Sequence, residues 1–336
     1  MPLSKLQFKP GINREGTNYS NEGGWFDGDK IRFRNGLPER IGGWTRVSNT
    51  QITGTPRKIF DFVTLSSQNL LFIGTEQKVF LENAGTFNDI TPIRSTVSLG
   101  TNPVNTTGGA GSGVVTITTQ AAHGAIAGDF VTLASLTTTD GITAAQLNIE
   151  HKITSVPSTT TFTITTAGSA TSGSTAGGGS SGTAAFQLNI GLNTTVLGSG
   201  WGAGTWGRFT WGSAAGSLSG QTLRLWSADN FGEDLIFNIA DSTIYYWDAT
   251  NGTSTRAVEL SSLTGASDVP IKARKILVSD VDRHCIAFGT TPIGSAILDP
   301  LLIRFSSQEE PQNWTPSATN TAGDLRLSKG SEIITA

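Results

Sequence analysis

The chain has 336 residues, a formal net charge of -3 and one cysteine. Its 37% of hydrophobic residues exclude a disordered chain and are enough for two or three domains with cores of their own. Proteins that coat nucleic acids carry clustered Lys and Arg, so the slightly negative charge argues against that class, although DNA could still slide through a conduit. The lone Cys285 excludes an internal disulfide, and its apolar neighbours predict a buried, reduced thiol.

The composition favours an all-β fold. Charged residues make up only 15% of the chain and glycines number 41, a balance that is typical of short strands joined by tight turns. Only residues 143–147 could form a single helical turn. Because we find neither a signal sequence nor a run of about 18 apolar residues, we expect no membrane-spanning segment and assembly in a cytoplasm.

Residues 1–55 are predicted to be an extended arm. They hold few large aliphatic side chains and many turn formers, so they are expected to need a partner surface to bury their apolar groups. Within the arm, Asn35 and Gly36 form a favoured two-residue hairpin turn, which would join a strand at 30–34 to one at 37–41.

The two faces of this hairpin differ in character. Lys30, Arg32 and Arg34 share one face, whereas Ile31 and Phe33 share the other. The basic face fits either a solvated surface or a patch that meets an acidic partner or DNA. The candidate assembly interface combines the aromatic, apolar and basic side chains of the arm: Trp25, Phe26, Lys30, Ile31, Arg32, Phe33, Arg34 and Trp44.

A blade-like β domain is predicted from residues 56–99 and 183–336. Apolar strands at 59–63, 70–74 and 79–81 alternate with polar turns, and a meander of about 40 residues is the size of a four-stranded propeller blade. The roughly 200 residues outside the arm and the insert described next would make about four blades.

Residues 100–182 are predicted to be an inserted small β-barrel or β-sandwich that folds on its own. Gly-rich and Ser-rich stretches bound the segment. Its phrases AAHGAIAGDFVTL, LNIEHKITSV and TTTFTITT resemble a small β module that recurs in phage virion proteins. Four strands are expected inside it, at 114–118, 130–133, 151–156 and 161–165.

The chain returns to the blade-like domain after the insert. Trp201, Trp206 and Trp211 fit neither the helix nor the strand period, and they indicate either a loop packed by tryptophans or an exposed aromatic contact for another chain. Residues 223–248 are predicted to form three strands with turns at 229–234 and 241–242. Trp226 and Trp247 lie in these strands and are expected in the core.

The last third is expected to continue the propeller-like array of β-meander blades. Its predicted strands lie at 275–279, 284–288, 301–305 and 325–327.

No catalytic, cofactor-binding or metal site is predicted, so we expect a non-enzyme that needs no cofactor. The scattered histidines His123, His151 and His284 favour structural roles. A group of carboxylates could bind a cation or act in acid/base chemistry, but such groups more often cap a turn and pair with arginines. These carboxylates are Asp229, Glu233 and Asp234, and the candidate arginines are Arg224 and Arg304.

Several phrases resemble a family of tail proteins from short-tailed bacteriophages (podoviruses), described as tail tubular, nozzle or DNA-stabilisation proteins. They are WSADNFGEDLIF, YYWDATNG, LDPLLIRFSSQEEPQNWTPSATNTAGDLRLSKGSEI and the opening MPLSKLQFKPGINREGTNYSNEGGWFDGDKIRFRNGLPERIGGW. The resemblance implies a structural virion protein, a homohexameric nozzle or tail-tube ring that retains packaged DNA and forms part of the ejection conduit. It further implies a tail adaptor above, tail fibres or tip proteins nearby and transient contact with viral DNA in the lumen. Family members continue beyond the last residue here, so how the blade ring closes stays open.

Two other classes remain as alternatives. A tail-associated glycan-binding or depolymerase protein would also be β-rich, with exposed tryptophans and paired acids. A receptor-binding fibre would have trimeric rather than ring symmetry.

Overall fold

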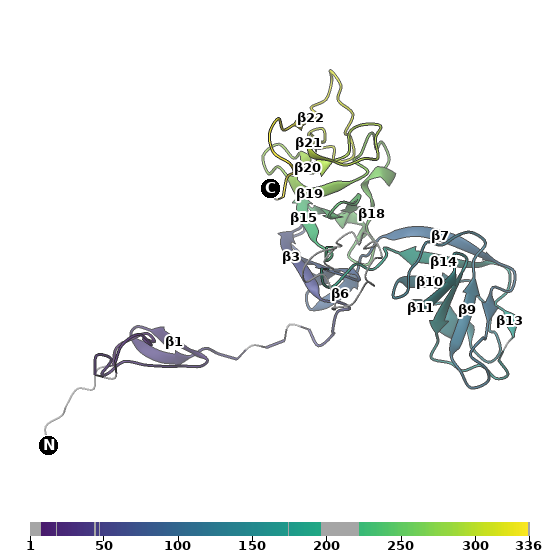
Figure 1. Ribbon diagram of the computed structural model, residues 1–336, viewed down its shortest axis with the longest axis horizontal. Helices are drawn as coiled ribbons and strands as arrows, with labels where there is room; N and C mark the ends of the chain where they lie inside the picture. Colours follow the sequence, from purple (N-terminus) through teal and green to yellow (C-terminus); the bar gives the residue numbers. More distant parts are fainter. Residues whose placement is uncertain are drawn as a thin grey trace, which may run out of the picture. The chain divides into compact units, whose positions relative to one another are not determined.

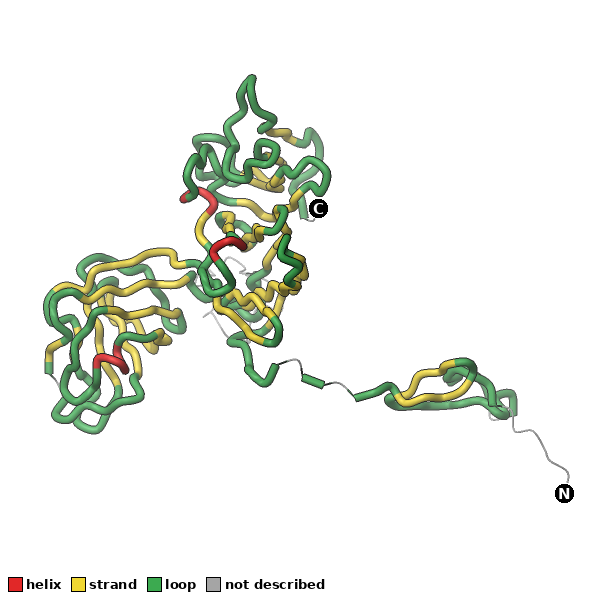
Figure 2. The backbone as a smooth tube through the Cα atoms, turned by 180° about the vertical axis from the view of Figure 1, so that it is seen from behind, coloured by secondary structure: helices red, strands yellow, loops and turns green. Residues whose placement is uncertain are grey.

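The computed structural model describes residues 8–17, 19–43, 45–46, 48–173, 175–195 and 222–334. It divides into two compact units, Met1–Asn49 and Thr50–Ala336. In the described residues strands dominate and helices are single turns, which confirms the predicted all-β class (Figure 2). The helical turns are α1 (Ala144–Leu147), η1 (Ala249–Asn251) and η2 (Leu260–Ser262). Four tryptophans with predicted roles lie outside the described residues: Trp44, Trp201, Trp206 and Trp211.

The first unit contains the predicted hairpin. Strand β1 (Ile31–Arg34) pairs with β2 (Leu37–Arg40) in an antiparallel register. Asn35 and Gly36 both have positive φ, 52° and 81°, as a two-residue turn that matches the strand twist requires. The predicted turn is therefore confirmed.

The second unit contains three four-stranded antiparallel meanders, which we call the first, second and third meander sheets. Each runs up and down with its strands in chain order. The first consists of β3 (Pro56–Val63), β4 (Asn69–Thr75), β5 (Val79–Asn83) and β6 (Thr86–Asp89). The second consists of β15 (Trp226–Phe231), β16 (Asp234–Ile239), β17 (Ile244–Trp247) and β18 (Val258–Glu259). The third consists of β19 (Ala273–Val278), β20 (Cys285–Thr290), β21 (Asp299–Phe305) and β22 (Gly323–Arg326).

The described residues thus form three such sheets rather than about four. The described residues outside the sheets include long loops such as 306–322. In none of the sheets built from described residues do the two outer strands pair with each other, so no sheet is closed.

The second meander sheet is buried on both faces. Along β16, Leu235 and Phe237 pack against the first sheet, whereas Ile236 packs against the third, and all three side chains are fully buried. This follows from the period of two along a strand, which sends alternate side chains to opposite faces. Figure 1 shows β15 between β3 and β19, the first strands of the neighbouring sheets, and β15 contacts both.

Trp226 and Trp247 are core residues, as predicted. Their side chains are only 7% and 1% exposed and belong to the cluster between the first and second sheets. The Trp226 indole N–H donates to the carbonyl of Thr75 at 2.9 Å. The ring also lies so close to Gly74 that a Cβ there would come within 2.6 Å of it.

The turn predicted at 229–234 is shorter than expected. Strand β15 continues through Phe231, which pairs with Asp234, so only Gly232 and Glu233 form the turn. Asp229, one of the polar residues that suggested the turn, instead binds the third sheet, as does Ser227 of the same strand. The N–H of Val278 donates to Asp229 Oδ2 at 2.8 Å, and that of Ile276 donates to Ser227 Oγ at 3.0 Å. These bonds satisfy N–H groups on the edge strand β19.

The insert forms an eight-stranded antiparallel sheet around its own core. Its order is β13-β8-β9-β12-β11-β10-β14-β7. The four predicted strands are confirmed as β9 (Val114–Thr118), β10 (Phe130–Ala134), β11 (Glu150–Ser158) and β12 (Thr161–Thr165). The remaining strands are β7 (Ile93–Gly100), β8 (Val104–Asn105), β13 (Ala176–Gly177) and β14 (Gly182–Gln187).

This sheet reaches beyond the predicted boundaries of 100 and 182. Strands β7 and β14 pair with each other and supply Leu99, Ala184 and Phe186 to the insert's core. The sheet curls, since Gln120 N donates to Ser98 O at 2.9 Å, but it stays open. A closed barrel is therefore not confirmed.

The single helical turn predicted at 143–147 is present as α1. Thr143 caps this helical turn and forms a capping box with Gln146. The Thr143 hydroxyl accepts from the Gln146 backbone N–H, and the Gln146 side chain accepts from the Thr143 backbone N–H. In the described residues, no helix is long and apolar enough to cross a membrane.

Candidate functional site

Part of the predicted assembly interface forms an aromatic cluster in the first unit. The ring of Trp25 lies 5.7 Å from that of Phe8 and 6.3 Å from that of Phe33. Ile31 and Phe33 are half-buried, whereas Phe26 is 60% exposed. None of the described residues of this unit is fully buried. The unit therefore holds large apolar side chains without a core that shields them from water.

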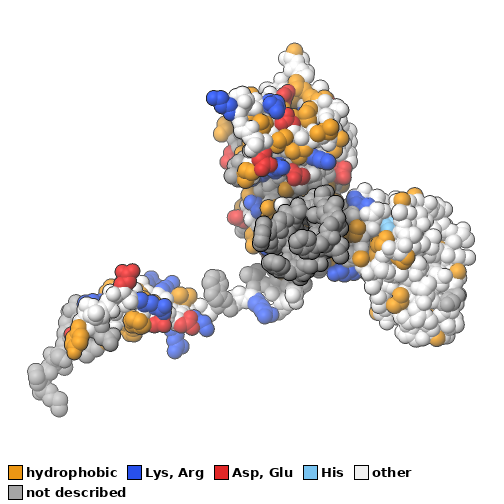
Figure 3. Space-filling view, in the orientation of Figure 1, with side chains coloured by type: hydrophobic (Ala, Val, Ile, Leu, Met, Phe, Trp, Pro, Cys, Tyr) orange, Lys and Arg blue, Asp and Glu red, His pale blue; other side chains and the backbone are white. Residues whose placement is uncertain are grey.

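The basic face of the hairpin is partly neutralised. Arg32 and Arg34 point away from the aromatic cluster and are exposed, but Arg32 forms a 3.0 Å ion pair with Glu39 of β2. Lys30 precedes the strand and has a positive φ of 56°. Its ammonium nitrogen lies 4.0 Å from Asp29 Oδ2. Figure 3 shows acidic and basic side chains side by side on this unit. The patch thus offers a mixed surface rather than a stripe of three unopposed bases.

A charged cluster joins the insert to the meander sheets. Lys78 is almost completely buried, and its ammonium group contacts Asp89 Oδ2 at 2.8 Å and also Glu150 of the insert. The same ammonium lies 4.3 Å from the ring centre of Phe130. Arg256 reaches the same two carboxylates at 3.3 and 3.4 Å. The charges of the two bases and the two carboxylates therefore offset one another where the first meander sheet, the insert and the segment between β17 and β18 meet.

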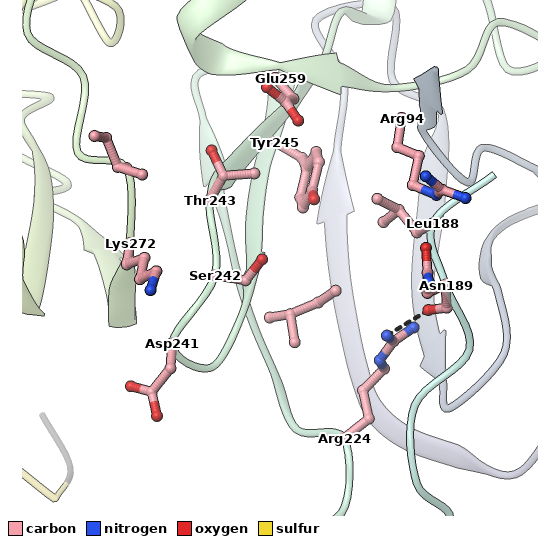
Figure 4. A pocket seen from close by; sticks show the side chains of 12 residues that line it. Arg94, Leu188, Asn189, Arg224, Asp241, Ser242, Thr243, Tyr245, Glu259 and Lys272 are labelled. Carbon is pink, nitrogen blue, oxygen red and sulfur yellow. Dashed lines mark hydrogen bonds between the residues drawn. The ribbon is translucent and has the colours of Figure 1, made fainter. Parts of the chain in front are cut away.

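A cavity of about 370 Å³ lies beside this cluster (Figure 4). Arg94, Asn189 and Arg224 lie along one wall, and Asp241 and Lys272 lie on the opposite side. The remaining lining residues come from the loop after β14, from the second sheet and from the segment before β19: Leu188, Ile239, Ser242, Thr243, Tyr245, Glu259 and Ile271. Arg94 and Glu259 also line a neighbouring cavity of about 330 Å³.

Two arginines of this cavity, Arg94 and Arg224, have lowered pKa values. Burial lowers the pKa of Arg94, and burial lowers the pKa of Arg224 to about 10, although the charge of Asp129 opposes both shifts. Within the part of the chain that the structure describes, neither guanidinium has a carboxylate within 4.0 Å. Both guanidinium groups are thus half-buried and have no ion-pair partner at contact distance, which is costly in free energy.

The predicted carboxylate group is dispersed over separate partners. Asp229 binds β19, as described above, and Glu233 Oε2 accepts from Leu65 N at 3.2 Å. Asp234 accepts from the Tyr246 hydroxyl and from Ala249 N. Burial raises the pKa of both Asp229 and Asp234.

The predicted pairing of these carboxylates with Arg224 or Arg304 is wrong. Arg304 is buried and donates to the backbone carbonyls of Thr291, Asp268 and Trp314. Arg224 donates to the carbonyl of Asn189. The carboxylates instead have backbone and hydroxyl partners close to them, which makes an arginine unnecessary.

The histidines lie in separate structural settings. His123 is buried against the rings of Phe162 and Phe186, and its Nδ1 accepts from Ala125 N. His151 contacts the carbonyl of Leu147 and His284 that of Ser306. Among the described residues no group of three or more metal-binding side chains occurs. Cys285 is free and fully buried, and burial raises its pKa, as expected for an unreactive thiol.

Sequence reasoning missed the cavity and the charged cluster. Their residues are separated by as many as 178 positions, from Arg94 to Lys272, and share no motif. One signal was present: residues 93–187 contain only five charged side chains, Arg94, Asp129, Asp140, Glu150 and Lys152. Three of the five, Arg94, Asp129 and Glu150, lie at the junction with the meander sheets or interact with groups there. The surface of the insert in Figure 3 is accordingly almost free of charge.

Comparisons with known proteins add little. No protein family matches the chain, and no curated protein does. Among solved structures the chain is similar to the phage phi92 endosialidase, with 14% identity and a TM-score of 0.24 over 87% of this chain. The chain spans 40% of the length of that protein. A likeness this weak carries no argument about fold or activity. The chain is thus an almost all-β protein with several open antiparallel sheets.

Proposed function

We propose that the chain is a structural protein of a short bacteriophage tail, a subunit of the nozzle or tail-tube ring that forms part of the DNA ejection conduit and retains packaged DNA. The sequence resemblance supports this class. We further propose that the protein is not an enzyme, that it belongs to the virion tail and that it is assembled in the cytoplasm of the bacterial host.

The stacking of the meander sheets supports a propeller-like arc in each subunit. Neighbouring sheets pack face to face through two continuous apolar clusters, and the first strand of the second sheet contacts the first strands of both others. This is the relation between successive blades of a propeller, in which the first strands lie closest to the axis. Three sheets make an arc rather than a closed ring.

The single observation that carries an assembly role is the absence of any fully buried residue among the described residues of the first unit. Its aromatic cluster around Trp25, and the exposed Phe26, can leave water only against a surface outside the unit. That surface comes either from the rest of the chain or from a neighbour, and in a tail ring we propose a neighbouring subunit or the tail adaptor. Contacts of this head-to-tail kind must close by rotational symmetry, and the resemblance implies six copies.

Electron microscopy of assembled tails tests this proposal. We expect six copies of the chain, with Trp25 and Phe33 covered by a neighbouring subunit or the adaptor. A chain that lacks residues 1–45 should stay folded but fail to join the tail. Arg34→Gln, on the exposed face of β1, is a milder variant that should weaken assembly mainly at low salt if an acidic partner faces it.

Three results would contradict the proposal. They are a copy number other than six, a first unit that lies free in solvent, and turnover of host polysaccharide that Asp234→Asn abolishes. The last result would favour a glycan-processing protein instead.

A further inference from the structure

Three cationic side chains line the 370 Å³ cavity without forming ion pairs. Arg94 comes from β7, Arg224 from the segment before β15 and Lys272 from the segment before β19. In the described part of the chain, none of the three has a carboxylate oxygen within 4.0 Å. By contrast, Lys78 and Arg256 of the adjoining charged cluster each contact two carboxylates. The cavity therefore concentrates positive charge that the fold does not neutralise at contact distance.

Arg224 is held firmly in this position. Its Nη2 donates to the carbonyl of Asn189 at 2.5 Å, and its guanidinium lies 5.6 Å from the ring of Trp226. The side chain passes so close to Gly191 that a Cβ there would come within 2.4 Å of the Arg224 Nε atom. Gly191 does not have a positive φ, so what it provides is space for the arginine. Such a preorganised guanidinium loses little entropy when it binds an anion.

Arg94 is placed in a similar way. Its Nη2 donates to the carbonyl of His123 at 2.7 Å, and its guanidinium lies 5.5 Å from the ring of Phe186. Each arginine also has one buried nitrogen without a hydrogen-bond partner among the described residues, Nε in Arg94 and Nη1 in Arg224. These two nitrogens are covered by surrounding protein, so an anion in the cavity would be bound by the other N–H groups of each guanidinium.

The acidic residues near the cavity are engaged elsewhere or lie farther away. Asp241 accepts from Arg274 Nε at 3.2 Å. Asp129 uses its oxygens on the N–H groups of Ile126 and Ile190, and it lies beyond ion-pair distance of both arginines. Glu259 is the one carboxylate that lines both cavities, and an oxygen of it is 3.5 Å from the Ser261 hydroxyl. Its charge would repel an anion beside it and so favours binding along the wall formed by Arg94, Asn189 and Arg224.

We propose that this cavity is a binding site for an oxyanion, a carboxylate or a phosphate group, held by Arg94 and Arg224. Planar guanidinium groups match both kinds of anion through paired N–H donors. Lys272 adds a third positive charge from the opposite side, and the Ser242 and Thr243 hydroxyls supply neutral donors. The inference concerns a site of one folded chain and does not depend on the proposed place in a phage tail.

Anion-dependent thermal unfolding of the full chain tests the site. Sodium phosphate and sodium acetate are titrated separately at constant ionic strength, with chloride as the balancing anion. We expect a saturable rise of the melting temperature with at least one of the two anions. Saturation with phosphate alone assigns a phosphate site and saturation with acetate alone a carboxylate site, whereas a response to both assigns a general oxyanion site. The absence of a saturable response to either anion overturns the proposal.

Variants identify the groups that bind the anion. Arg224→Gln and Arg94→Gln should each raise the dissociation constant about tenfold or more, because each removes a charged donor. Gly191→Ala should weaken binding in the same direction, since it displaces Arg224 without changing any charge. Arg326→Gln, whose side chain is 60% exposed on β22, is the matched control and should leave the response unchanged.

Each outcome with these variants is informative. If Arg224→Gln does not fold, Arg94→Gln and Gly191→Ala still report on the cavity. A response that persists in both of those variants, or that Arg326→Gln weakens equally, would show that the anion binds elsewhere and would overturn the proposal.

Discussion

Single side chains connect neighbouring sheets in this protein. Trp226 packs in the cluster between the first and second sheets, donates to Thr75 and occupies the space that Gly74 leaves open. Asp229 does the equivalent on the other side by accepting from Val278 of the third sheet. An aromatic ring and a half-buried carboxylate thus serve the same end, because each forms a hydrogen bond with a backbone group of the neighbouring sheet.

Replacement of Trp226 by Ala should destabilise the chain by about 3–5 kcal/mol, the usual effect of removing a buried Trp. Trp226→Phe should cost less, since it keeps much of the packing and loses the hydrogen bond to Thr75. Urea unfolding followed by circular dichroism measures the free energy of unfolding. Leu65→Ala is the control, because Leu65 is 85% exposed. Equal unfolding midpoints for Trp226→Ala and Leu65→Ala would contradict the packing described here.

Asp89 predicts a specific acid sensitivity. Burial by itself raises its pKa, but the charges of Arg256 and Lys78 and the hydrogen bonds that it accepts outweigh burial, so the pKa lies below its ordinary value of 3.8. A carboxyl whose pKa is lower in the folded state stabilises the fold above its unfolded pKa. This contribution is lost as the pH falls below 3.8 and through the folded pKa.

Asp89→Asn should therefore be less stable than the natural chain at neutral pH, by about 1–3 kcal/mol, since Lys78 and Arg256 each lose a charged partner. The difference should shrink as the pH falls below about 4. Urea unfolding at neutral pH and in acid measures it, with Asp61→Asn at an exposed position of β3 as the matched control. A difference that is the same at every pH would show that Asp89 does not contribute through its charge.

At the scale of elements, the insert has a core of its own but is joined to the meander sheets by two strands and a charged cluster. Its core cluster draws only on residues between Leu99 and Phe186, and the clusters of the meander sheets draw on none of these. It is connected through β7 and β14, which lead the chain in and out, and through the charged cluster around Lys78. The paired entry and exit strands explain how a domain can lie within another without interrupting its core.

The insert should fold as an isolated chain of residues 92–190. These limits keep β7 and β14, and they include Ile190, whose N–H donates to Asp129 at 2.7 Å. We expect a cooperative thermal transition and a dispersed NMR spectrum, both lost in Phe162→Ala, which removes a fully buried ring. A natural fragment without a cooperative transition would show that the insert depends on the meander sheets.

At the scale of the whole molecule, the two units have different kinds of stability. The three core clusters formed by described residues lie between Phe62 and Trp314, within the second unit. The described residues of the first unit form a two-stranded hairpin, an isolated bridge between Ile12 and Trp25 and the aromatic cluster, and a two-stranded hairpin alone is marginally stable in water. The stability of the chain therefore resides in the second unit.

A chain that begins at Thr50 should unfold at nearly the same temperature as the full chain, within about 2–4 °C. The reason is that removal of the first unit leaves every core cluster of the second unit intact. Differential scanning calorimetry of the two chains measures this, and Phe72→Ala in the shorter chain serves as a control for a real loss of stability. A much lower melting temperature for the shorter chain would show that the first unit contributes to the core.

The sequence by itself determined the features that depend on neighbouring residues. The alternation at 31–34, the turn at Asn35 and Gly36, the helical turn at 143–147 and the burial of Trp226 and Trp247 follow from local period and turn chemistry, and all were predicted.

Only the tertiary structure decided the features that depend on distant partners. The pairing of β7 with β14 extended the insert, and β15 continued through Asp229 because β19 supplied an N–H for its carboxylate. Arg94, Arg224 and Lys272 meet at one cavity although no motif links them. The physical reason is that the role of a polar side chain depends on the group with which it interacts. In these cases that group lies tens or hundreds of residues away in the sequence.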